Sequence, residues 1–406
     1  MTTYEESINW LFEQFPAYQK IGAVAYKPDL SNTLSLCKQL NIDFNQLQYI
    51  HVAGTNGKGS TSNMIASICM ERGLKTGLFT SPHIHDFRER ILVDGKQISE
   101  ERIVSFCQQI RNLTLEVRPS FFEITWALTL TYFIESNCEI CVIETGLGGR
   151  LDSTNIISPI LSVITNIGMD HVAILGDTLE KIACEKAGII KTSIPVVIGE
   201  TLPETISVFE TSAKSHNSTI FWAEKEEFTN TFHFPNESYQ WKNERTVRTA
   251  MRALNCLGFE FSETQINAGI ENTNKNTGFK GRFEIINQNP LTIIDVAHNV
   301  DGIKQLLRTV ESSVTGQLHI VYGTSSDKDL DSILSLFPRD AKFYLTEFSS
   351  ERSAKIADLR KSAETIGLNA TYFSKMKEAV ETAQQSANKT DTILITGSFF
   401  LISDFF

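Results

Sequence analysis

"HVAGTNGKGSTSNMIAS", residues 51–67, lies where a strand-like run gives way to a helical pattern, and it reads almost as a phosphate-binding loop. Such a loop needs several backbone N–H groups that converge on one oxyanion, a positive side chain and usually a hydroxyl for magnesium. The common pattern places a glycine five positions before Gly-Lys-Ser/Thr. Here Val52 holds the first glycine position, and Gly59 separates Lys58 from Ser60. The stretch is therefore either a nucleotide site with an altered spelling or a glycine-rich βα turn with a solvent-exposed lysine.

The residues of this loop divide the chemical roles of a phosphate site among them. Glycines let the backbone approach the phosphates, Lys58 supplies positive charge, and Ser60 or Thr61 supplies a hydroxyl. Because a strand pattern precedes the loop and a helix pattern follows it, the context favours nucleotide binding. The predicted nucleotide contacts here are Gly54, Thr55, Asn56, Gly57, Lys58, Gly59, Ser60 and Thr61.

Composition and charge narrow the possible classes of function. The chain has 406 residues, which is room for two or three domains, and a formal net charge of −11. Long Lys/Arg runs are absent, so nucleic-acid binding is not expected, because it depends on neutralising phosphates. No apolar run approaches the ~18 residues needed to cross a membrane. The seven cysteines are an odd, scattered set typical of reduced thiols. We expect a soluble cytoplasmic protein that acts on small molecules.

Short β-rich runs alternate with helical ones, which predicts an α/β fold with a mostly parallel sheet. The stretch 271–290 is rich in Asn and Gly and lacks apolar periodicity, so we interpret it as the linker region. We predict a nucleotide-binding domain at 1–275, a linker at 276–290 and a smaller α/β domain at 291–406. The predicted strands lie within residues 49–54, 75–81, 139–146, 157–167, 193–199, 291–299, 317–329, 342–349 and 392–400.

Three further residues are candidates for the site, and the first of them lies at the carboxyl end of a strand, where the ligands of open α/β sheets gather. Glu144 ends an apolar strand pattern, and a carboxylate there can hold magnesium, which prefers oxygen ligands. Alternatively it caps the glycine turn that follows. His171 comes just after another strand pattern, although a lone histidine is more often structural. Lys186 has apolar neighbours, so desolvation can lower its pKa and make the amine reactive; alternatively it is an ordinary helix-end lysine.

Eight motifs together, rather than any one of them, carry a resemblance to a known family. They are HVAGTNGKGST, TSPHIHDFRERI, ETGLGGRLDSTN, TNIGMDHVAILGDTLEKIACEKAGIIK, GRFE, DVAHN, GTSSDKD and TGSFFL, which span essentially the whole chain. Their order and spacing resemble those of the folylpolyglutamate synthase and dihydrofolate synthase family, part of the Mur ligase superfamily. The resemblance implies a Mur-ligase-like P-loop ATPase domain followed by a smaller, Rossmann-like glutamate-ligase domain.

The resemblance also implies a reaction and a set of cofactors. Enzymes of this family form an amide with ATP: a carboxylate of dihydropteroate or of a reduced folate is phosphorylated, and the amine of L-glutamate attacks the acyl phosphate. Two magnesium sites are implied, with Ser60 and Glu144 at the first and His171 with Lys186 at the second. Lys186 matches a lysine that the family often carries as a carbamate, which is an anionic oxygen ligand. The catalytic residues implied are Lys58, His171, Lys186 and His298.

The remaining contacts are assigned by motif from the same resemblance. Asn243 matches an adenine-contacting asparagine, Arg282 a phosphate-reaching arginine and Asp295 a ribose-binding carboxylate. Because these groups flank the linker, the resemblance implies that ATP is held between domains. Taken alone, Arg282 fits an interdomain ion pair equally well. The stretch TSPHIHDFRERI matches the mobile loop that covers the pterin. The substrate contacts implied are Ser81, Pro82, His83, Phe122, Glu123, Asp152, Asn299 and Ser398.

Two positions depart from the family pattern without touching the presumed magnesium ligands. Lys280 stands where a proline commonly precedes Gly-Arg, which changes the expected stiffness of the linker. Phe400 stands where a tyrosine is frequent, which removes a hydroxyl that could bond a substrate or Ser398. Neither change argues against catalysis.

Three alternatives to a bifunctional enzyme follow from the same residues. A Mur-type cell-wall peptide ligase usually carries a UDP-binding domain before the phosphate loop, whereas only fifty residues precede His51 here. A non-catalytic nucleotide-binding protein would be expected to lack a key group, yet the lysines, hydroxyl, carboxylate and histidine are all present. A folylpolyglutamate synthase alone would use the same ATP machinery. We favour the bifunctional enzyme, and we expect a monomer because the family implies one and no coiled-coil heptads oppose it.

Overall fold

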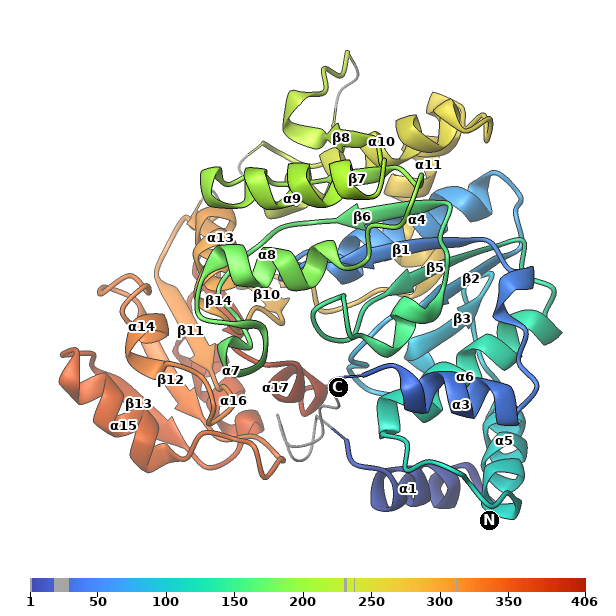
Figure 1. Ribbon diagram of the computed structural model, residues 1–406. Helices are drawn as coiled ribbons and strands as arrows, with labels where there is room; N and C mark the ends of the chain where they lie inside the picture. The colour runs from blue at the N-terminus through green and yellow to red at the C-terminus, as the bar shows by residue number, and fades with distance from the viewer. Residues whose placement is uncertain (1, 18–28, 230–231, 237, 312) are drawn as a thin grey trace. The chain divides into compact units, whose positions relative to one another are not determined.

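The computed structural model describes the chain except for residues 1, 18–28, 230–231, 237 and 312. The chain divides into two compact units (Figure 1). The first comprises Met1–Phe234 and Gln240–Phe279, and the second Pro235–Tyr239 and Lys280–Phe406. The chain therefore enters the second unit briefly, ahead of α10, before it completes the first.

The first unit is built on a mostly parallel sheet whose strand order, in the described part of the chain, is β4-β3-β2-β5-β1-β6-β7-β8. Only β3 and β4 run antiparallel to their neighbours. The central strand β1 pairs with β5 on one side and β6 on the other, so the carboxyl ends of the three strands meet at one edge. The strands are β1 Tyr49–Ala53, β2 Thr76–Phe79, β3 Ile91–Val93, β4 Lys96–Gln97, β5 Ile140–Glu144, β6 Leu161–Ile164, β7 Val196–Ile198 and β8 Ile220–Trp222.

Helices cover both faces of this sheet because successive side chains of each buried strand point to opposite sides. One face packs on α4, α10 and α11 around Ile50, Val52 and Val142. The other face packs on α5 and α6 and, further along the sheet, on α8 and α9. The helices are α1 Tyr4–Gln14, α3 Ser31–Gln39, α4 Lys58–Glu71, α5 Glu100–Asn112, α6 Phe121–Glu135, α7 Val172–Leu175, α8 Leu179–Ala187, α9 Pro203–Ser215, α10 Tyr239–Cys256, α11 Glu263–Glu271 and α12 Thr273–Thr277, with short 3-10 turns at η2 Phe44–Gln46, η3 Phe87–Arg90, η4 Ser153–Ile156 and η5 Ala223–Lys225.

The second unit has its own sheet and its own core. The strand order is β13-β12-β11-β14-β10-β9, parallel except for β9. Helices α13, α14 and α15 pack on one face around Ile293, Ile320 and Leu394. The elements are β9 Glu284–Gln288, β10 Leu291–Asp295, α13 Val300–Glu311, β11 Leu318–Tyr322, α14 Leu330–Leu334, β12 Lys342–Thr346, α15 Ile356–Thr365, β13 Ala370–Phe373, α16 Met376–Ser386, β14 Thr392–Thr396 and α17 Phe399–Ser403.

The observed division differs from the predicted boundaries at the linker. Residues 273–277 form α12 in the first unit, and the change of unit lies between Phe279 and Lys280. Residues 284–288, expected to be linker, form the edge strand β9 instead. Most side chains of this strand are exposed, so it lacks the apolar run that marks the buried strands. Among the described helices, none combines the length and apolarity that crossing a membrane requires.

Candidate active site

The segment between β1 and α4 turns at two glycines that no other residue could replace without strain. Gly54 has φ +153° and Gly57 has φ +82°. A Cβ atom at Gly54 would lie 1.9 Å from Oγ1 of Thr165, and one at Gly57 would lie 2.3 Å from Oδ1 of Asn243. The loop backbone is therefore packed tightly against its neighbours, and α4 begins directly after it at Lys58.

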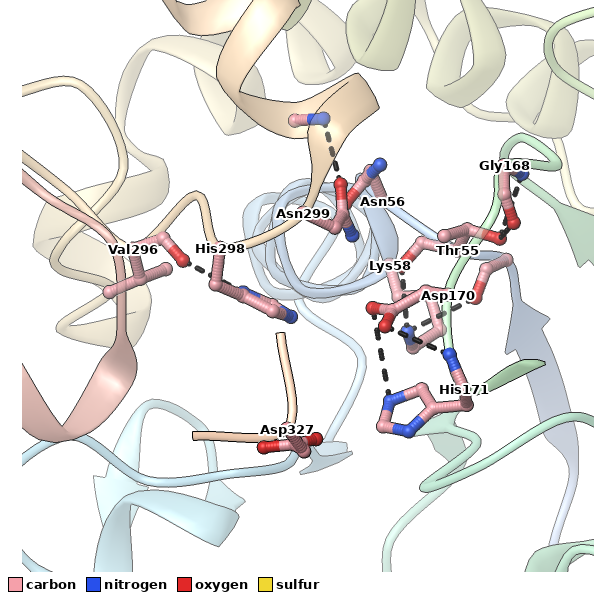
Figure 2. Close-up of polar contacts among 12 residues, drawn as sticks. Thr55, Asn56, Lys58, Gly168, Asp170, His171, Val296, His298, Asn299 and Asp327 are labelled. Atoms are coloured by element: carbon pink, nitrogen blue, oxygen red, sulfur yellow. Dashed lines mark hydrogen bonds and ion pairs between the residues drawn. The ribbon is translucent and has the colours of Figure 1, made fainter. Parts of the chain in front are cut away.

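Side chains at the carboxyl end of β6 hold this loop in place. Thr165 Oγ1 donates to the Asn56 carbonyl at 2.6 Å, and the Asn56 N–H donates to Oδ1 of Asn166 at 2.7 Å. The Thr55 hydroxyl bonds both the carbonyl and the N–H of Gly168, at 3.1 and 3.0 Å (Figure 2). Protein side chains thus hold the loop backbone in this shape, and a preorganised anion site requires such support.

Two lysines converge on one carbonyl oxygen of the loop. Lys58 Nζ donates to the carbonyls of Gly54 and Thr55, at 3.1 and 3.2 Å. Lys186 Nζ, from the end of α8, donates to the same Gly54 carbonyl at 2.8 Å. Burial, and after it the positive charge of Lys58, lower the pKa of Lys186 to about 7, although Asp170 and Asp152 act in the opposite direction. Lys186 is therefore close to half neutral at physiological pH, unlike an ordinary helix-end lysine.

The first turn of α4 and the end of β5 present oxygen donors that fit a magnesium ion. The hydroxyls of Ser60, Thr61 and Ser62 are buried and have no hydrogen-bond partner among the described residues. Glu144 is also buried, and a Cβ atom at Gly59 would lie 3.9 Å from its Oε2, so its carboxylate faces this turn. The described residues contain no group of three or more His, Cys, Asp and Glu that could hold a metal. Mg²⁺ is usually held by one or two carboxylates, waters and substrate phosphates, and the Glu144 carboxylate and the Ser60 hydroxyl would be the protein ligands here.

His171 lies beside an acidic residue at the start of α7. Its backbone is left-handed, with φ +50°, and it precedes the helix. Its ring Nε2 lies 3.8 Å from Oδ2 of Asp170, whose Oδ1 accepts the His171 N–H at 2.9 Å (Figure 2). His171 and Lys186 thus belong to one unit, and Asp170 adds a carboxylate that the sequence analysis did not single out.

The predicted substrate loop connects directly to Glu144. The N–H of Ser81 donates to Oε2 of Glu144 at 3.2 Å, and a cis peptide bond joins Ser81 to Pro82. Arg90 is buried and donates to Nδ1 of His83 at 2.8 Å. Burial, together with this arginine, lowers the pKa of His83 well below its ordinary value. His83 is therefore neutral, and its Nδ1 is already used by the protein.

The start of α6 carries the other two predicted pterin contacts. Glu123 accepts the N–H of Ser120 at 2.6 Å and the Thr33 hydroxyl at 3.2 Å, so its carboxylate caps the helix and anchors α3. Phe122 lies under the glycine turn after β5, because a Cβ atom at Gly146 would come within 2.5 Å of its ring. Of the two side chains, Phe122 is the one that faces this turn.

In the second unit, Asp295 ends β10 and Arg282 lies just ahead of β9. Asp295 accepts hydrogen bonds from Tyr239 Oη at 2.5 Å and from the N–H groups of Phe283 and Ala297, both at 2.8 Å. The Arg282 guanidinium lies over the Phe399 ring, 4.8 Å from its centroid. Asp295 is thus surrounded by protein donors, a role that the motif alone did not reveal.

Three more predicted residues of this unit are fixed by local bonds. His298 Nδ1 lies 2.9 Å from the Val296 carbonyl, and Asn299 accepts the N–H of Gly302 at 2.8 Å (Figure 2). Ser398 caps α17 by accepting the N–H of Phe400 at 3.1 Å. Because Nδ1 of His298 faces the Val296 carbonyl, Nε2 lies on the opposite side of the imidazole ring and takes no part in that contact.

Comparison with known protein families covers both units. The Mur ligase middle domain matches residues 52–287, and the Mur ligase glutamate ligase domain matches residues 281–399. A Bacillus subtilis dihydrofolate synthase/folylpolyglutamate synthase is 32% identical over 431 aligned residues, covering 99% of this chain and 98% of the relative. The chain belongs to the folylpolyglutamate synthase/dihydrofolate synthase family.

Solved structures of this family share the fold over the full length. An Escherichia coli FolC in complex with DHPP and ADP superposes with a TM-score of 0.86 at 27% identity, covering 99% of this chain and 96% of that one. A bifunctional enzyme from Yersinia pestis, solved with AMPPNP and a manganese ion, gives a TM-score of 0.84 at 25% identity, with 99% and 97% covered. A folylpolyglutamate synthase from Thermotoga maritima gives 0.80 at 30% identity, with 98% and 95% covered. The predicted family and α/β fold are confirmed.

The sequence did not reveal the two residues after β6 that position the loop, nor the carboxylate beside His171. Thr165, Asn166 and Asp170 lie within a quoted motif but had no assigned role. A usable signal existed, because Thr165 and Asn166 directly follow β6, the neighbour of β1. Tyr239 had no comparable signal, since its partner Asp295 lies 56 positions away.

Proposed function

We propose that this protein is a bifunctional dihydrofolate synthase and folylpolyglutamate synthase. It would add L-glutamate to dihydropteroate, and to the γ-carboxylate of reduced folates, with ATP as the energy source. The full-length similarity to a curated enzyme of that name carries the proposal. The preformed loop, with Lys58 at its end and buried hydroxyls behind it, supports it. The second candidate function is folylpolyglutamate synthase activity alone, because a relative from Lacticaseibacillus casei with that name is 29% identical.

The proposed reaction activates a carboxylate that cannot otherwise acylate an amine. One carboxylate oxygen attacks the γ-phosphorus of ATP, and ADP leaves. The glutamate amine then attacks the acyl carbon, loses a proton, and expels phosphate together with that carboxylate oxygen. Phosphoryl transfer needs mainly positioning and charge neutralisation, which the loop N–H groups and Lys58 would supply.

Magnesium, when bound, neutralises phosphate charge and orients the transferred group. The Ser60 hydroxyl and the Glu144 carboxylate are the donors proposed to hold it, and the manganese-bound relative supports a metal in this family. A second magnesium site is proposed in the same unit, with His171 and a carbamate at Lys186 as its ligands. Asn243, Arg282 and Asp295 remain the proposed contacts of adenine, phosphate and ribose. His298, Asn299 and Ser398 remain proposed on the glutamate side, and the monomeric state and cytoplasmic location stay predictions.

Carbamylation of Lys186 is expected because a carbamate forms from a neutral amine and carbon dioxide. With a pKa of about 7, Lys186 keeps a neutral fraction at pH 7 to 8, and that fraction falls as the pH is lowered through 7. Carbon-13 NMR of the intact protein in labelled bicarbonate should show a carbamate signal that is lost in Lys186→Arg and that weakens at acidic pH. Lys181, on the same helix, is the internal control, because the ion pair with Asp177 raises its pKa. An unmodified Lys186 at every bicarbonate concentration would defeat this prediction.

The two candidate activities are separated by supplying each acceptor alone. We expect ATP- and glutamate-dependent product, seen by mass spectrometry, with dihydropteroate and also with tetrahydrofolate. Product with tetrahydrofolate only would favour the single-activity enzyme. Product with neither acceptor would overturn the proposed function.

A further inference from the structure

A buried histidine on β1 is connected by hydrogen bonds to the glycine turn that follows Glu144. His51 is fully buried, and its Nε2 lies 2.8 Å from the Thr154 hydroxyl oxygen. That hydroxyl lies 2.5 Å from Oδ1 of Asp152 and is itself fully buried. The other oxygen of Asp152 accepts the Leu147 N–H at 2.8 Å. The connection therefore runs from His51 through Thr154 and Asp152 to the turn.

The proton positions along this chain can be assigned from hydrogen-bond capacity. Backbone N–H groups of Thr154 and Leu147 donate to the two oxygens of Asp152, so its carboxylate acts as an acceptor on both sides. The Thr154 hydroxyl then donates its one proton to Asp152. Its oxygen then accepts from His51, which places the imidazole proton on Nε2. Nδ1 of His51 has no hydrogen-bond partner among the described residues, which fits a bare acceptor better than a buried unpaired N–H group. The opposite tautomer would need the Thr154 proton for Nε2 and would remove it from Asp152.

The state of Asp152 depends on these donors. Burial raises the pKa of Asp152 above its ordinary value, and hydrogen bonds from the Thr154 hydroxyl and from the N–H groups of Leu147, Thr154 and Gly146 offset part of that rise. His51 stays neutral, because burial lowers its pKa to about 3. The Asp152 carboxylate thus draws the Gly146–Leu147 backbone inward over the Phe122 ring.

We propose that His51 is a positioning residue: acting through Thr154 and Asp152, it fixes the Gly146–Leu147 turn that shapes the pteroate side of the site. This inference rests on the proposed function for the identity of that substrate. In this proposal Asp152 supports the turn, because protein groups donate hydrogen bonds to both of its carboxylate oxygens. His51 itself lies on the strand that precedes the phosphate loop, so one strand serves both ends of the reaction centre.

A double-mutant cycle tests the relay. His51→Leu and Thr154→Val each remove one hydrogen-bonding group and fill the buried position with an apolar side chain. Each should raise the KM for dihydropteroate about tenfold, the lower end of the usual loss when a supporting residue is removed, while the KM for ATP changes little. The double variant should be no worse than the single ones, because the residues act as one unit. His51→Gln, whose amide can donate to Thr154, should recover most of the loss.

Two further measurements separate positioning from simple loss of stability. His319→Leu is the matched control: His319 is also fully buried on a parallel strand and lies 3.0 Å from a tyrosine hydroxyl, in the second unit. It should lower Tm without changing the KM for dihydropteroate. Nitrogen-15 NMR of the wild-type protein should show His51 protonated on Nε2.

An unchanged KM, additive effects in the cycle, or a proton on Nδ1 would each overturn the relay. The NMR result does not depend on activity. A wild-type protein that is inactive with every acceptor would contradict the proposed function, while the NMR spectrum would still decide the relay.

Discussion

Replacing Lys58 by alanine should reduce turnover on the order of a thousandfold with either acceptor, in line with the loss of one preorganised donor at an oxyanion. Lys58 is the first residue of α4, and its amine lies against the carbonyls of Gly54 and Thr55. From there it can reach a phosphate held by the loop N–H groups. Release of ADP under saturating ATP, glutamate and acceptor measures the effect on kcat.

Lys181→Ala is the matched control for this change. Lys181 is an exposed lysine of the same unit, and its amine pairs with Asp177 at 2.7 Å. Exposed pairs of this kind contribute little to stability because water screens them, so activity should stay near that of the parent. If Lys58→Ala kept turnover within a few-fold of the parent, the loop would lose its proposed role.

Gly57→Ala should abolish nucleotide binding, because it combines backbone strain with a collision. At φ +82° an alanine costs about 1–2 kcal/mol. Its Cβ atom would also lie 2.3 Å from Oδ1 of Asn243, so either the loop must move or the Asn243 side chain must leave its position. Calorimetric titration with ATP should show no measurable binding, although the fold remains because both cores lie elsewhere.

Gly73→Ala isolates the strain from the collision. Gly73 follows the same helix and has nearly the same φ, +84°, but no atom lies within 4 Å of its Cβ position. This variant should lose stability by a similar amount and still bind ATP. Equal ATP affinities for the two variants would show that contact between the loop and Asn243 does not matter.

The buried parallel strands were predictable, whereas the edge strands were not. Val52, Val142 and Val163 lie on strands covered by helices on both faces, which produces continuous apolar runs. β9 and β13 are edge strands with largely exposed or half-buried side chains, and β8 is only three residues long. Their stability comes from pairing with a neighbour rather than from a local pattern, so the sequence carries little trace of them.

In the site, spacing revealed the groups that come directly after a strand. Lys58 and Glu144 were found because the ends of β1 and β5 mark them in the sequence. The relay of His51, Thr154 and Asp152 was not found, because 103 positions separate His51 from Thr154. Contacts of that kind depend on how the strands are ordered in the sheet, and that order was not predicted.

The central claim is that ATP activates a carboxylate as an acyl phosphate before glutamate attacks. Dihydropteroate labelled with oxygen-18 in its carboxylate tests this directly, with the released phosphate analysed by mass spectrometry. An acyl-phosphate intermediate requires one labelled oxygen in each inorganic phosphate, formed in step with the amide and only when ATP and glutamate are both present. Unlabelled phosphate alongside amide product, or label recovered in AMP, would contradict it.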